Sequence, residues 1–219
     1  MINQLTKNFF DKNGYVFIKN FLNKEVTTLL YNYSITQVKS IDYKKQYSEN
    51  KFDSKWDGDF GDGQVYNSYY RYGDPIIDTL LTLSLNNMEI FTGKNLVPTY
   101  SYWRFYEKGD ELVKHRDRES CEISTTICLG YNYSNIDINV NKNYSWPMFI
   151  KEKNNENLPV NMEPGDMLIY RGCEIEHWRE KLLGLNHTQA FLHYNEKEGP
   201  YNIQYDGRPF VGIPKLFKE

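Results

Sequence analysis

The stretch EKGDELVKHRDRESCEISTTICLG, residues 107–130, decides the fold and raises the main question about function. It places His115 and Asp117 two residues apart in a run that otherwise has the composition of a strand. Side chains alternate between the two faces of a strand, so both groups would point the same way and Arg116 the opposite way. An apolar interior does not accept an unpaired imidazole and carboxylate, whereas a divalent metal ion binds both. A surface salt bridge or a satisfied core histidine is the alternative interpretation.

Short strand patterns follow one another in the part of the chain that surrounds this stretch. Strand candidates separated by turn signals occur after Pro98: TYSYWRFYEKG, ISTTICLGYN, SWPMFIKE, DMLIYRG and TQAFLHYN. EPGD at 163–166 predicts a tight turn. A second histidine, His177, lies 60 residues after Asp117 in YRGCEIEHWREK. Two imidazoles and one carboxylate form the facial ligand set that leaves positions open on a first-row metal.

The first half of the chain predicts helices and one strand. GYVFIKNF at 14–21 has the alternation of a strand, and Asn23 is suited to cap a helix over KEVTTLLYNYSITQV. Asp74 followed by proline begins a second helix that ends near Gly93. Residues 42–74 are polar and rich in Gly and Asp, which predicts a long loop. Its aromatic residues are candidates for covering a substrate, with a flexible surface loop as the alternative.

Composition excludes some classes of protein. The 219 residues carry a net charge of −3 with a pI of about 5.9, which argues against a nucleic-acid partner. Three cysteines without CxxC spacing predict a reducing compartment. No signal-peptide pattern and no membrane-spanning run are present, so we expect no membrane association and a cytoplasmic location. The many Asn, Lys, Tyr and Ile residues are typical of an AT-rich genome, such as that of a virus or phage active in a host cytoplasm.

The order of HRD, ICLGYN, EPGDMLIY and EHW resembles the iron(II)/2-oxoglutarate-dependent dioxygenases, most closely their prolyl-hydroxylase branch. NGYVFIKNFLNKE resembles the opening strand and helix of the same family, so the resemblance covers most of the chain. It implies an α+β fold with a double-stranded β-helix core, jelly-roll or cupin-like, and N-terminal helices packed outside. It also implies one oxygenase domain, 1–219, with a strand, helices and aromatic loop in 1–98, the core in 99–195 and an irregular tail in 196–219.

The resemblance further implies a cofactor set and a reaction. Fe(II) would be held by His115, Asp117 and His177, with 2-oxoglutarate as cosubstrate and O2 as oxidant. The products would be succinate, CO2 and a hydroxylated protein side chain, such as a prolyl group, or a hydroxylated small metabolite. Asp117 favours hydroxylation, because halogenating relatives have a small residue there. The rival interpretations are a catalytically silent cupin-like binding module and a zinc-dependent hydrolase with the same ligands.

The distal carboxylate of 2-oxoglutarate requires a fixed cation, and here the chain departs from the family. Relatives place an Arg or Lys nine to eleven residues after the distal histidine, but this chain has Asn, His and Thr at 186–188. His187 would serve if protonated. Arg179 and Arg104 are substitutes, with rim ion pairs as their alternative role. Tyr106 matches a tyrosine that lines the cosubstrate pocket in prolyl-hydroxylase relatives.

Overall fold

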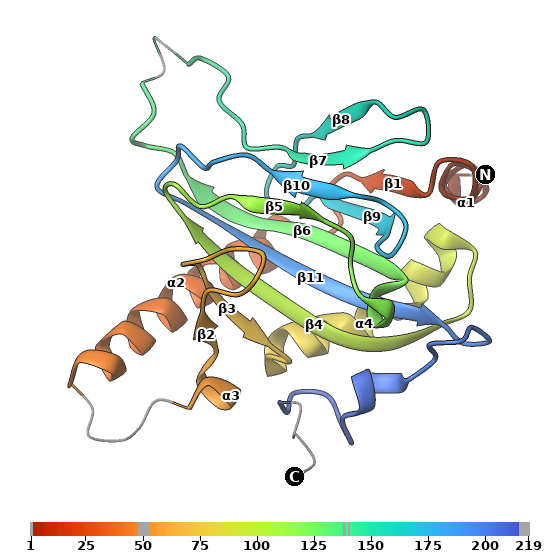
Figure 1. Ribbon diagram of the computed structural model, residues 1–219, viewed down its shortest axis with the longest axis horizontal. Helices are drawn as coiled ribbons and strands as arrows, with labels where there is room; N and C mark the ends of the chain where they lie inside the picture. Colours follow the sequence, from red (N-terminus) through yellow and green to blue (C-terminus); the bar gives the residue numbers. More distant parts are fainter. Residues whose placement is uncertain (1, 48–52, 138, 140, 215–219) are drawn as a thin grey trace.

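Two antiparallel sheets form the centre of the computed structural model, which describes residues 2–47, 53–137, 139 and 141–214 (Figure 1). The larger sheet has the strand order β1-β9-β6-β11-β4-β3-β2, and the smaller sheet has the order β5-β10-β7-β8. The strands are β1 Tyr15–Ile18, β2 Asp59–Phe60, β3 Tyr69–Tyr72, β4 Leu96–Glu107, β5 Leu112–His115, β6 Ile123–Asn132, β7 Met148–Lys151, β8 Asn157–Val160, β9 Met167–Arg171, β10 His177–Arg179 and β11 Asn186–Glu196. The helices are α1 Ile2–Asn13, α2 Lys24–Tyr47, α3 Ser54–Asp57 and α4 Pro75–Thr92, with 3-10 turns η1 Glu119–Cys121 and η2 Gln204–Gly207.

The chain crosses repeatedly between the two sheets from β4 onward. Strands β4, β6, β9 and β11 belong to the larger sheet, whereas β5, β7, β8 and β10 belong to the smaller one. This alternation of eight strands is the double-stranded β-helix that the sequence predicted, with strands extending the larger sheet at both edges. Buried residues from both sheets, including Cys128, Ile150 and Leu168, pack together between them.

Strand β6 shows how the sequence prepares an interior that is not purely apolar. Its bounds coincide with the predicted segment ISTTICLGYN, and nearly all of it is buried. Ile123 and Ile127 pack into the cluster that joins the larger sheet to the helices. Between them, the hydroxyls of Ser124 and Thr126 form side-chain hydrogen bonds to His193 and Gln189 of the neighbouring strand β11. Because side chains alternate, the strand has one apolar face for the helices and one polar face.

Helices α2 and α4 cover the outer face of the larger sheet, as predicted, and lie behind it in Figure 1. The predicted starts of α2 and α4 are confirmed: Asn23 accepts from the first turn of α2, and Asp74 accepts from the amide nitrogens of the first turn of α4. Gly93 ends α4 in the left-handed region at φ 68°. Leu81 and Met88 of α4 are fully buried, and each contributes about 1.5–3 kcal/mol by leaving water. No helix in the described part of the chain is both long and apolar enough to cross a membrane.

The long loop predicted for residues 42–74 is wrong in extent. Helix α2 continues to Tyr47, with Ile41 still buried against the core, and β2 and β3 add two strands to the edge of the larger sheet. Residues 48–52 of the predicted loop lie outside the described residues. Sequence analysis also gave no helix for the segment that forms α1. The local sequence of these segments is as polar as that of a loop. Tertiary packing therefore determines that they form helix or strand.

Candidate metal centre

Three side chains from two distant segments converge between the sheets, as the sequence predicted. His115 at the end of β5 pairs with His177 at the start of β10, and their ring centroids lie 4.2 Å apart. Nε2 of His115 lies 3.6 Å from Oδ1 of Asp117, and Nε2 of His177 lies 3.5 Å from the same oxygen. The potential ligand atoms of all three residues lie within 4.8 Å of one another. One small cation can therefore contact all three side chains.

Asp117 reaches this point by a different route from the one predicted. The expectation that it shares a strand with His115 is wrong, because β5 ends at His115. Instead, the backbone nitrogen of Asp117 donates to the carbonyl of Gly172, at 3.0 Å, which ties it to the turn after β9. A side chain at Gly172 would collide with the Asp117 carboxylate and the Cys121 carbonyl. Glycine at this position is thus needed to let the two segments approach.

Outer hydrogen bonds orient each of the three groups. Nδ1 of His115 lies 2.7 Å from the Val113 carbonyl, and Nδ1 of His177 lies 2.9 Å from the Ile175 carbonyl. A carbonyl can only accept, so both Nδ1 atoms are protonated and both Nε2 lone pairs face Asp117 in the neutral imidazoles. Lone pairs and a carboxylate oxygen directed at one point fit a first-row divalent metal.

The carboxylate of Asp117 is held from its other side. Ser124 Oγ donates to Oδ2 of Asp117 at 2.6 Å, and Nδ1 of His193 lies 3.0 Å from the same hydroxyl. Burial acts to raise the pKa of Asp117, but in the metal-free chain the contacts with His115 and His177 in their protonated forms outweigh burial and hold that pKa well below the usual value. Burial lowers the pKa of His193 to about 4, so this imidazole is neutral at pH 7. Oδ1 of Asp117 remains available to a cation.

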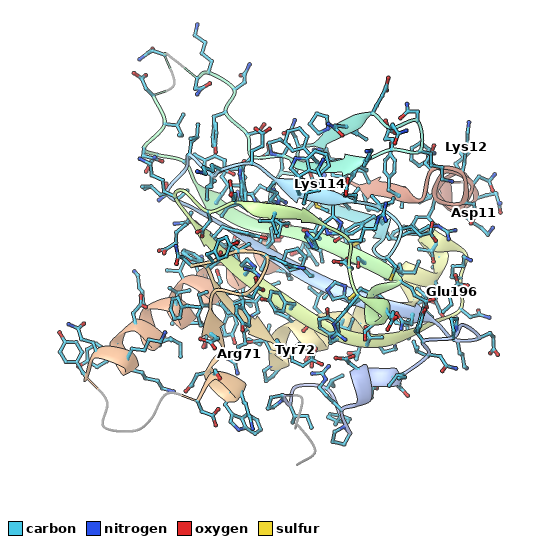
Figure 2. All side chains as sticks on the ribbon, viewed as in Figure 1. Asp11, Lys12, Arg71, Tyr72, Lys114 and Glu196 are labelled. Atoms are coloured by element: carbon cyan, nitrogen blue, oxygen red, sulfur yellow. The ribbon has the colours of Figure 1, made fainter. Side chains whose placement is uncertain are left out.

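A cavity of about 390 Å³ opens beside the three residues. That volume falls in the range of small-molecule sites, about 300–1,000 Å³. Alternate residues of β4 from Tyr100 to Tyr106 line it, together with Phe191 of β11 and Asp62 from the connection between β2 and β3. The loop that the sequence singled out for its aromatic residues therefore does contribute to the cavity, although through a carboxylate. Lys114 of β5, labelled in Figure 2, extends outside, where its ammonium group lies 4.0 Å from the Trp178 ring.

Arg179 is buried on the same strand as His177 and has unused hydrogen-bonding capacity. The residue is 2% exposed, and Nη1 donates to the Trp146 carbonyl at 2.7 Å. Nε and Nη2 are buried, as is the hydroxyl of Tyr106, and none of the three atoms has a hydrogen-bond partner among the described residues. Arg179 forms no ion pair with any residue that the structure describes, and burial lowers its pKa. A guanidinium without a counter-charge is costly to bury, which points to an anionic ligand.

His187 and Arg104, the other two candidates for the carboxylate anchor, are engaged differently. Oε1 of Gln189 accepts from Thr126, so its NH2 group donates to Nε2 of His187 at 2.6 Å. Nδ1 of His187 then donates to the Tyr133 hydroxyl at 2.6 Å. Burial, with the nearby Arg179, holds the pKa of His187 well below its usual value. Both ring nitrogens of His187 are thus used within the protein, whereas Arg104 is paired with Asp62 at the cavity.

Sequence reasoning missed two residues that shape the centre, Ser124 and Gly172. Ser124 lies within an ordinary strand pattern seven residues after Asp117, and no local signal distinguishes it from a core serine. Its position on the inward face of β6 was the only clue. Gly172 follows a strand, where a glycine normally indicates a turn. The contacts of both residues with Asp117 depend on segments brought together only by folding.

No protein-family model matches the chain. No curated protein matches it either. Solved structures do match. A prolyl-4-hydroxylase from Pseudomonas putida superposes with a TM-score of 0.61 at 10% identity, over 89% of this chain and 98% of the other.

Two further structures extend the likeness. SnoK, an alpha-ketoglutarate-dependent carbocyclase of nogalamycin biosynthesis, gives a TM-score of 0.64 at 12% identity, over 98% of this chain and 94% of that one. EctD from S. alaskensis, solved with bound Fe, gives 0.60 at 13% identity, over 97% of this chain and 86% of that one. The chain therefore has the double-stranded β-helix fold of the 2-oxoglutarate-dependent iron oxygenases, and at these identities its function must be derived from its own site.

Proposed function

We propose that this chain is an iron(II)- and 2-oxoglutarate-dependent oxygenase that hydroxylates its substrate. The observation that carries the proposal is the convergence of His115, Asp117 and His177, with two Nε2 lone pairs and one carboxylate oxygen directed at one point beside a cavity. Two imidazoles and one carboxylate, with open positions left on the metal, are the ligand set of non-haem iron(II) oxygenases. These three residues would hold the iron.

Unsatisfied donors in the inner part of the site support 2-oxoglutarate as the cosubstrate. Arg179 would bind the distal carboxylate of 2-oxoglutarate through Nε and Nη2, and the Tyr106 hydroxyl would donate to it as well. These three donor atoms are buried and have no partner among the described residues, so a carboxylate would satisfy all three at once. His187 occupies the position where relatives have a cation, and in this proposal it packs beside Arg179 as a neutral group. Arg104 stays the rival for the anchor, and the variants described below separate the two.

The residues of the chain act by holding and orienting. The carbonyls of Val113 and Ile175 fix the histidine tautomers, and Ser124 restricts Asp117 to one free oxygen. When bound, iron and 2-oxoglutarate together supply an oxidant derived from O2, with release of succinate and CO2. Asp117 also occupies the place where a small residue would admit a halide, which favours hydroxylation as the outcome.

The substrate of this proposal is a protein side chain, such as a prolyl group, or a small metabolite. Both kinds are represented in the names of the structural neighbours, which include a prolyl-4-hydroxylase and a carbocyclase of nogalamycin biosynthesis. We also propose that the N-terminal helices, core and tail act as one oxygenase domain. The free cysteines suit a reducing compartment such as the cytoplasm.

Succinate formation tests the proposal against its rivals. The purified chain is incubated with Fe(II), ascorbate and 2-oxoglutarate in air, without added substrate, and succinate is measured. We expect succinate that depends on iron and on O2 and that is absent when Zn(II) replaces iron. A silent cupin-like module or a zinc hydrolase gives no succinate under either condition, and that result would overturn the proposal.

A further inference from the structure

A second polar cluster lines the cavity, apart from the three convergent side chains. Arg104 of β4 is 1% exposed, and its Nη2 donates to Oδ2 of Asp62 and, at 2.8 Å, to the Tyr102 hydroxyl. Tyr102 in turn donates to the same oxygen of Asp62 at 2.9 Å. Nη1 of Arg104 is buried and has no hydrogen-bond partner in the described part of the chain. All three residues line the cavity, so this unsatisfied donor belongs to the wall of the space that a substrate would fill.

The turn that carries Asp62 fixes this cluster in place. Oδ1 of Asp62 accepts from the backbone nitrogens of Gln64 and Val65 at 2.8 and 2.9 Å, and the Asp62 nitrogen donates to the Val65 carbonyl. The carboxylate is thereby held by its own turn, and Arg104 is held by the carboxylate. The guanidinium needs little further ordering when a ligand binds, which favours affinity.

Charge near the cavity favours an anion. Arg104 is paired with Asp62, and Arg118, which also lines the cavity, is paired with Asp206 at 2.7 Å. Arg116 lines the cavity too, is exposed and forms no ion pair with any described residue. When the metal-binding side chains are left out of the count, these three arginines carry three positive charges, and the two paired carboxylates carry two negative charges. One positive charge in excess attracts an anionic ligand.

Aromatic rings form the wall beside the cluster. Tyr102 and Phe191 both line the cavity and are partly exposed, with ring centroids 6.1 Å apart. Tyr70 stacks on Tyr102 from the neighbouring strand at 5.1 Å, which holds that ring in position. Rings fixed in this way give a flat apolar surface on which a cyclic or aliphatic body can pack.

We propose that the substrate is a small carboxylate whose anionic group binds Nη1 of Arg104 and whose apolar body packs on Tyr102 and Phe191. This inference rests on the proposed function. In that function, the cosubstrate places one carboxylate at Arg179 and the other on the metal, so Arg104 is left for the substrate. The inference thereby assigns Arg104 to substrate recognition and Arg179 to cosubstrate binding.

Binding of a matched pair of probes tests the assignment. The chain is loaded with Mn(II) and 2-oxoglutarate without oxygen and titrated calorimetrically with phenylacetate and with phenylacetamide, which differ in charge. A charge-assisted hydrogen bond predicts that the acid binds about tenfold or more tightly than the amide. Arg104→Gln should remove this preference. Arg171→Gln, which removes an arginine that does not line the cavity, is the matched control and should keep it.

Asp62→Asn keeps the proposal testable should Arg104→Gln fail to fold. The amide oxygen can still cap the turn, whereas the charge that competes for Arg104 is lost, so we expect the acid to bind about threefold more tightly or better. Equal binding of acid and amide to the wild-type chain overturns the inference, and so does an unchanged preference in folded Arg104→Gln. Failure to bind Mn(II) and 2-oxoglutarate at all would instead count against the proposed function.

Discussion

The two ends of the interior differ in whether their polar groups have hydrogen-bond partners. At the metal end, formed by His115, Asp117, His177 and Ser124, every group has an outer hydrogen bond that fixes its direction. At the inner end, formed by Tyr106, Arg179 and His187, Tyr106 and Arg179 retain buried donors that have no partner among the residues the structure describes. The first end is prepared before any ligand arrives, and the second is left incomplete.

This contrast separates two physical requirements. Metal ligands must be aimed in advance, because their geometry sets which ion binds and how many positions stay open. A carboxylate anchor has to leave its donors free, and the cost of burying them is recovered only when the ligand binds. Satisfied polar groups therefore mark the metal end, and unsatisfied ones mark the inner end.

Removal of a ligand at the metal end should have the largest effect. Asp117→Ala deletes one of the three convergent groups. Removing a residue that only hydrogen-bonds to a metal ligand typically costs about 10–100-fold, and we expect iron-dependent succinate formation to fall by more than that. Glu119→Ala removes a nearby carboxylate outside the cavity and serves as the control. Circular dichroism should show little change in either variant. Full activity in Asp117→Ala would remove the metal assignment.

Changes at the inner end should alter cosubstrate affinity and stability in opposite directions. Arg179→Met leaves the metal ligands in place, and we expect the KM for 2-oxoglutarate to rise about 10–100-fold as charge-assisted hydrogen bonds are lost. In the absence of ligand, the free energy of unfolding should stay level or rise by about 1–4 kcal/mol, because an unpaired buried charge has gone. Urea unfolding without 2-oxoglutarate measures the second effect. If Arg104→Gln alone raises this KM, the anchor lies at Arg104.

Loss of an outer partner at the metal end should weaken the metal without removing it. Ser124→Ala deletes the hydrogen bond to Oδ2 of Asp117, and we expect Mn(II) affinity to fall about tenfold. A titration followed by electron paramagnetic resonance measures free Mn(II). Ser134→Ala, which changes an exposed serine, should leave the affinity as it is. An unaltered affinity in Ser124→Ala would mean that Asp117 is held without this hydroxyl.

Protonation of His193 in acid should lower the free energy of unfolding of the metal-free chain, and this is the smallest of the predicted effects. Its pKa is lowered to about 4 in the folded chain, against about 6.5 when unfolded, so the unfolded state takes up the proton first. The contribution of His193 to the free energy of unfolding is fully present above pH 6.5 and is lost as the pH falls toward 4. Between pH 7.5 and 5.5 we expect a loss of about 1 kcal/mol. His193→Asn should lose correspondingly less in urea unfolding at the two pH values, and an identical pH dependence in both proteins would contradict this origin.

The segments that the sequence predicted well carry strong local signals. Strand β6 has the predicted bounds because β-branched residues and a polar end define it, and α4 begins and ends where Asp74 and Gly93 cap it. The part around residues 42–74 was predicted poorly, since the end of α2 and the short strands β2 and β3 depend on burial against distant residues rather than on propensity. Local sequence encodes helix caps and the alternation of apolar and polar residues in strands. It does not encode which polar segment packs against a distant part of the chain.

The site divides in the same manner. Residue types and their order along the chain were sufficient to predict His115, Asp117 and His177 as one cluster, although the predicted reason, a strand shared by His115 and Asp117, was wrong. Only the tertiary structure decided how the candidate anchors are engaged: it uses both ring nitrogens of His187 and leaves Arg179 without a counter-charge among the described residues. Hydrogen-bond partners come from separate strands, and their pairing exists only after the sheets have closed over them.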